Sequence, residues 1–72
     1  MSERILHQAQ AWGFLCQRDG LGNWLIYPKK RTERWQLSQA QAGERWLLVV
    51  GGVPQMNMTT EEVLVFLECR LR

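Results

Sequence analysis

Histidine, proline and cysteine are all scarce in this chain of 72 residues, which has one His, two Pro and two Cys. The two thiols, Cys16 and Cys69, lie far apart and belong to no CxxC pair, and His7 has no companion at metal-ligand spacing. A disulfide between the two thiols is an alternative that we favour less. No pattern indicates a metal site or an activated nucleophile, so we expect no cofactor and predict that the protein is not an enzyme.

Long apolar runs are also missing, because the longest, residues 46–50, falls far short of the ~20 residues that cross a bilayer. The N-terminus has polar side chains where a secretory signal would need an apolar stretch, namely Ser2, Glu3, Arg4, His7 and Gln8. Charge of one sign is not in excess either. Nine Lys and Arg against seven Asp and Glu give a net charge of +2, which by itself does not indicate nucleic-acid binding. We therefore predict a cytoplasmic location and no membrane partner.

Apolar residues, in contrast, make up 46% of the chain and include four Trp. A domain of this size buries only about 60% of the surface that its unfolded chain exposes. Large indole side chains compensate for the small buried surface, since one of them can bury about 200 Å². We predict a single small α+β domain over residues 1–72.

Hydrophobic periodicity predicts one helix at each end of the chain and strands between them. The first helix is expected over residues 2–12, with Gly13 ending it. The second runs from Thr60 to about Leu71, after a capping box in which Thr59 and Glu62 bond each other's backbone. The predicted strands cover residues 14–18, 24–27, 34–39 and 45–50, and residues 51–58 are expected to form a loop. The fold class is α-β-β-β-β-α, an antiparallel four-stranded meander with both helices packed on one face.

Three of the tryptophans, Trp24, Trp35 and Trp46, recur at an interval of eleven residues, and Glu-Arg precedes the last two. An interval of 8–12 residues is typical of consecutive strands in a meander. Successive strands run in opposite directions, so Trp24 and Trp46 are expected toward one end of the sheet and Trp35 toward the other. The interval therefore indicates a sheet and not a repeated binding unit.

Side-chain alternation along the predicted strands divides the sheet into two faces. The first is nearly all apolar and is expected under the helices: Phe14, Cys16, Trp24, Ile26, Trp35, Leu37, Trp46, Leu48 and Val50. The second, which we call the open face, is mixed: Leu15, Gln17, Leu25, Tyr27, Lys29, Arg34, Gln36, Ser38, Arg45, Leu47 and Val49.

The open face is the predicted functional surface, because a partly apolar sheet face left in solvent often marks a partner site. Its apolar side chains would supply affinity, and its basic side chains would steer an acidic partner. The predicted function is a non-enzymatic protein-interaction module or a small subunit of an assembly. The partner-binding residues are predicted to be Leu25, Tyr27, Leu47 and Val49, with Lys29, Arg34 and Arg45 at the margin. Ordinary surface hydrophobicity is the alternative.

Two further apolar features lie outside the predicted sheet faces. Val65 and Cys69 fall on the outer side of the second helix, where a homodimer contact is one interpretation. Met56 and Met58 precede that helix, and methionine adapts its shape to an apolar partner. The other interpretation of the methionines is that they pack under the sheet edge.

The alternative function is binding of RNA or single-stranded nucleic acid. The segment Lys29, Lys30 and Arg31, together with Arg34, is the densest positive region, and Tyr27 could stack on a base beside it. Salt separates the two hypotheses, because phosphate contacts weaken steeply as salt rises.

Overall fold

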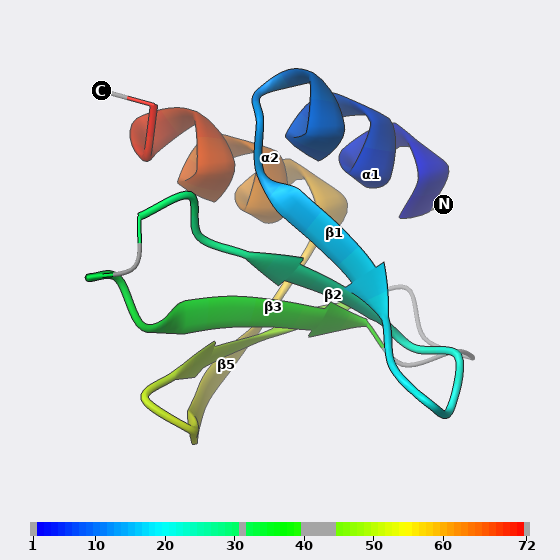
Figure 1. Ribbon diagram of the computed structural model, residues 1–72, viewed down its shortest axis with the longest axis vertical. Helices are drawn as coiled ribbons and strands as arrows, with labels where there is room; N and C mark the ends of the chain where they lie inside the picture. Colours follow the sequence, from blue (N-terminus) through cyan, green and yellow to red (C-terminus); the bar gives the residue numbers. More distant parts are fainter. Residues whose placement is uncertain (1, 31, 40–44, 72) are drawn as a thin grey trace.

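A computed structural model describes residues 2–30, 32–39 and 45–71 of the chain. It shows two neighbouring helices packed over one side of a twisted sheet (Figure 1). The elements are α1 (Ser2–Ala11), β1 (Leu15–Arg18), β2 (Trp24–Tyr27), β3 (Trp35–Gln39), β4 (Trp46–Val50), β5 (Val53–Met58) and α2 (Thr60–Cys69). The predicted turn at residues 40–44 and the predicted site residue Arg31 lie outside the described part.

The sheet has the strand order β1-β2-β3-β4-β5, and each strand is antiparallel to its neighbours. This confirms the α+β class and the antiparallel meander. The predicted number of four strands is wrong, because the structure has a fifth strand in the segment that we expected to be a loop.

Strand β5 follows a two-residue turn at Gly51 and Gly52, whose φ angles of 59° and 83° are those of a type I′ hairpin. The hairpin brings Val53 opposite Val50. The alternation of side chains is then broken, because the register shifts next to Val49 and Pro54 occupies a strand position. Proline is tolerated there because β5 is an edge strand and needs fewer backbone donors. Because of these two irregularities, apolar and polar residues do not alternate along this segment, and the sequence pattern of a strand is missing.

Helix α1 ends as predicted at Gly13, whose φ of 89° lies in the left-handed region that favours glycine. The Gly13 N–H donates to the Gln10 carbonyl at 3.0 Å, and the Phe14 N–H donates to the Ala9 carbonyl at 2.9 Å. This pair of bonds is a Schellman motif. It turns the chain so that Phe14 enters the core directly after the helix.

Helix α2 begins with the predicted capping box. The Glu62 N–H donates to Thr59 Oγ1 at 3.3 Å, and the Thr59 N–H donates to Glu62 Oε1 at 2.9 Å. The helix ends at Cys69, two residues before the predicted limit.

The capping box allows a stability test. Thr59→Ala is expected to lower the free energy of unfolding by about 1 kcal/mol, because backbone donors of the first turn lose their acceptor. Thr60→Ala is the matched control, since Thr60 lies inside the first turn and does not form the box. Urea unfolding followed by circular dichroism measures both. Equal midpoints for Thr59→Ala and the wild type would show that the box contributes nothing.

The core confirms the predicted helix-facing side of the sheet. Trp46 is fully buried, Trp35 is buried, and Trp24 packs against the core cluster from its margin. The register places Gln39 between Trp24 and Trp46 in one row, while Trp35 pairs with Val50 at the other end. The buried apolar side chains of the core are Ile5, Leu6, Ala9, Phe14, Ile26, Trp35, Leu37, Trp46, Met58, Val63 and Leu67.

Candidate interaction surface on the open sheet face

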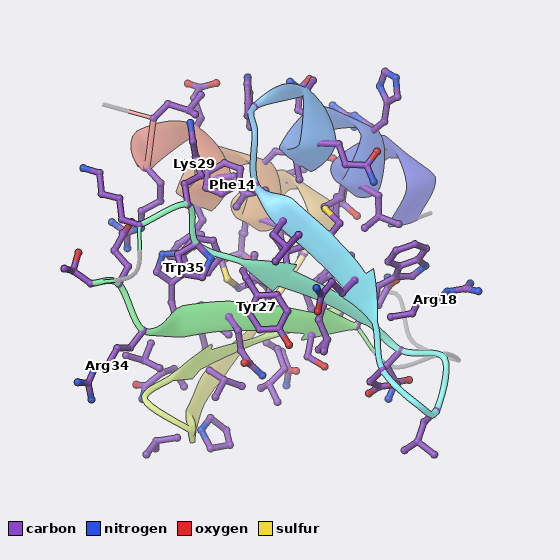
Figure 2. The ribbon with its side chains drawn as sticks, viewed as in Figure 1. Phe14, Arg18, Tyr27, Lys29, Arg34 and Trp35 are labelled. Carbon is purple, nitrogen blue, oxygen red and sulfur yellow. The ribbon has the colours of Figure 1, made fainter. Side chains whose placement is uncertain are left out.

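The open face is formed by side chains from all five strands, arranged in two rows across the sheet. Strand pairing places five residues side by side in one row: Gln17, Leu25, Ser38, Leu47 and Asn57. The other row contains Leu15 opposite Tyr27, and Gln36 opposite Val49, which in turn lies opposite Pro54. Both described helices lie on the other side of the sheet, and Figure 2 shows the Tyr27 ring in front of the strands, away from them.

The apolar part of this face is divided by a polar lane. Strand β3 contributes Gln36 and Ser38, which lie between the β2 side chains and the β4 side chains. Neighbouring strands are ~4.8 Å apart, so the β2 and β4 side chains are separated by about 10 Å. The six central side chains are all half-buried: Leu25, Tyr27, Gln36, Ser38, Leu47 and Val49. The face therefore combines two apolar pairs with a strip of hydrogen-bonding groups.

The two predicted arginines flank this face at opposite ends of the strands. Arg34 lies at the hairpin end, where its carbonyl accepts from the Gly51 N–H at 3.0 Å. Arg45 precedes Trp46, which pairs with Gln39 at the far end of β3. Six residue steps at ~3.3 Å each place these two positions about 20 Å apart along the strands. Both arginines are exposed, so positive charge is available at both ends of the face and not along one margin.

Lys29, which we predicted at the margin of the open face, lies instead on the helix side. Its Nζ is 5.8 Å from the centre of the Phe14 ring (Figure 2). The Lys29 side chain also packs against Gly13. A Cβ atom at this glycine would lie 3.4 Å from Lys29 Cε. The reason is that β2 ends at Tyr27 and Pro28 redirects the chain, so the alternation of the strand does not continue to Lys29.

The positive region around Lys29 lies at the C-terminal ends of the helices. A cavity of about 170 Å³ is found there, lined by Phe14, Lys29, Lys30, Glu33, Arg70 and Leu71. The Arg70 guanidinium lies 4.5 Å from the centre of the Phe66 ring, and its Nε is 3.8 Å from Glu33 Oε1. Helix C-termini carry negative partial charge and attract such cations. The alternative nucleic-acid site is thus divided, because Lys29 and Tyr27 lie on different sides of the sheet.

The thiols and the histidine are distributed without a common site. Cys16 is half-buried on the helix-facing side, and burial raises the pKa of its thiol, which makes the reactive thiolate scarcer. Cys69 and His7 are exposed, and neither cysteine forms a disulfide. Among the described residues, no three His, Cys, Asp or Glu side chains are placed to hold a metal ion.

Comparison with protein-family models, curated proteins and solved structures returned no match. In the described ranges, neither helix has the length and apolar character to cross a membrane. The open face also contains Pro54 and Asn57. The sequence prediction missed both residues because their strand was not recognised. The Gly51–Gly52 pair between two valine-containing segments is a hairpin signal that could have found them.

Proposed function

We propose that the protein is a non-enzymatic interaction module that binds another protein through the open sheet face. The observation that supports this is the pair of apolar sets, Leu25 with Tyr27 and Leu47 with Val49, on a face that no described helix covers. Exposed apolar patches framed by polar groups are typical of interaction sites. Arg34 and Arg45 at the two ends favour a partner that carries carboxylates.

The size of the face predicts a transient complex. Five strands at ~4.8 Å and about four residues at ~3.3 Å give roughly 300 Å². A standard interface buries about 800 Å² on each partner. An affinity in the micromolar range is therefore expected for a partner that contacts this face alone.

The test replaces the β4 pair on the open face. In the variant Leu47→Ser/Val49→Ser, capture of partner proteins from the native cell extract is expected to fall at least tenfold, because two apolar contacts worth more than ~1.4 kcal/mol together are lost. Leu21→Ser is the matched control, since Leu21 is 78% exposed in the β1–β2 loop and its loss should leave capture unchanged. Quantitative mass spectrometry of the captured proteins is the measurement.

Nuclease treatment and salt discriminate the alternative. Capture by the open face should survive nuclease and change little with salt. Loss of all captured protein after nuclease, with steep weakening as salt rises, would support nucleic-acid binding instead. Equal capture by the wild type and the double variant would exclude the open face as the binding site.

A further inference from the structure

The two helices leave part of the helix-facing side of the sheet uncovered. Helices pack 8–10 Å apart, so two of them cover fewer than five strands at ~4.8 Å. Helix α1 packs against β1 and α2, and α2 contacts β5, but the part of β4 and β5 next to their hairpin turn has less cover. There Val50 is 42% exposed, Val53 57% and Met56 47%, although the register puts them on the same side as Trp46.

A groove lies where the end of β5 meets α2. The groove has a volume of about 400 Å³ and is lined by Met58, Glu61, Glu62, Val65 and Phe66. Met56 lies two residues before Met58 on the same side of β5. At the other end, Phe66 contacts Trp35 at 5.0 Å between ring centres, and Trp35 pairs with Val50. We name these side chains together the α2–β5 surface: Val50, Val53 and Met56 on the sheet, and Met58, Val65 and Phe66 at the groove.

The α2 side of this surface is acidic. Glu61 and Glu62 line the groove, and Glu68 lines a second cavity that also includes Val65. The single described ion pair of Glu61 is with Arg4 at 3.5 Å, between side chains that are 66% and 74% exposed, where screening makes it weak. Negative charge is therefore concentrated at the N-terminal end of α2, around Glu61 and Glu62, whereas Arg70 lies over the Phe66 ring at the other end. The net charge of the protein is +2. The occupant that complements the surface is apolar and positively charged.

The backbone of β5 argues against an added strand. Pro54 has no N–H to donate, and the register shift beside Val49 distorts the pairing edge. A second copy related by two-fold symmetry also fits poorly, because the same patch would face itself and bring four groove glutamates together. A helix needs no donors from the edge, and it would lie beside α2 as a third helix over β4 and β5.

We propose that the α2–β5 surface binds a basic amphipathic helix of a partner protein. Its apolar side would cover Val53, Met56 and Val65, and its lysines and arginines would meet Glu61 and Glu62. Met56, which is exposed, suits this role because a flexible methionine side chain adapts to different apolar surfaces. This surface and the open face lie on opposite sides of the sheet, so the two proposals are independent.

The probe is a synthetic Leu/Lys amphipathic helix of about 18 residues, which is ~5 turns long, with a fluorescent label. Fluorescence anisotropy at physiological salt is expected to show micromolar binding to the full chain. The variant Met56→Ser/Val65→Ser should bind at least tenfold more weakly. Leu21→Ser and Leu47→Ser/Val49→Ser should bind like the wild type, and a Leu/Glu helix of the same pattern should bind at least tenfold more weakly than the Leu/Lys helix. Circular dichroism confirms that each variant is folded.

Five results would overturn the inference. The first is no anisotropy change up to ~1 mM protein, which corresponds to a binding free energy of only about 4 kcal/mol. The second and third are equal binding of a scrambled peptide without an apolar side and equal binding of the Leu/Glu helix. The fourth is unchanged binding by Met56→Ser/Val65→Ser. Binding that is lost only in the open-face variant would also overturn it, while leaving the proposed function in place.

Discussion

Trp46→Ala is expected to lower the free energy of unfolding by about 3–5 kcal/mol, the range for removing a buried Trp. Trp46 is the largest fully buried side chain of the protein. It lies on β4, between Gln39 of β3 and Met58 of β5, so its removal opens a cavity under three strands. Stabilities of 0.05–0.15 kcal/mol per residue are typical of small domains. A chain of 72 residues then has about 4–11 kcal/mol, so the loss would remove between roughly a third and all of its stability.

Circular dichroism and urea titration measure this effect. The variant is expected to unfold at a much lower urea concentration than the wild type at 25 °C. Trp24→Ala is the matched control, because the same side chain is removed from a half-buried position at the margin of the core. A loss below ~1 kcal/mol for Trp46→Ala, the level typical of an ordinary substitution, would contradict the placement of this indole beneath the helices.

Trp35→Ala is expected to cost a similar ~3–5 kcal/mol, for a different reason. The Trp35 ring makes edge contacts with Phe14 at 5.8 Å and with Phe66 at 5.0 Å. Its Nε1 also donates to Glu33 Oε1 at 3.3 Å. One side chain thus joins β3 to α2 and to the segment that enters β1.

A double-mutant cycle isolates the ring contact between Trp35 and Phe66. With Trp35→Leu and Phe66→Leu, which keep the core filled, the coupling energy is expected to be about 0.5–1.5 kcal/mol. The control cycle pairs Phe66→Leu with Trp24→Leu, because Trp24 lies at the other end of the sheet from Trp35, the ring that Phe66 contacts. There the effects should add to within ~0.5 kcal/mol. Additive effects in the first cycle would show that the edge contact contributes nothing beyond burial.

The candidate site could be predicted in part. Leu25, Tyr27, Leu47 and Val49 were assigned to one face by alternation alone, and the register confirms that they share it. Alternation does not show which strand lies between the β2 pair and the β4 pair. The strand order was needed to show that the polar residues of β3 separate the two pairs. Alternation also applies only within a strand. Lys29 lies beyond the end of β2, and alternation therefore assigned it to the wrong side of the sheet.

The sequence itself determined both helices, four of the five strands, the capping box and the glycine helix end. It also determined that Trp35 and Trp46 face the core. These features depend on neighbours within a few residues: hydrogen bonds inside one turn, and side chains that alternate along one strand. The tertiary structure alone decided that residues 53–58 pair with β4 as a fifth strand. It also decided that two helices leave Val53, Met56 and Val65 uncovered. An edge strand with a proline and a register shift carries little local signal, because its conformation is stabilised by hydrogen bonds to a partner strand and not by its own sequence pattern.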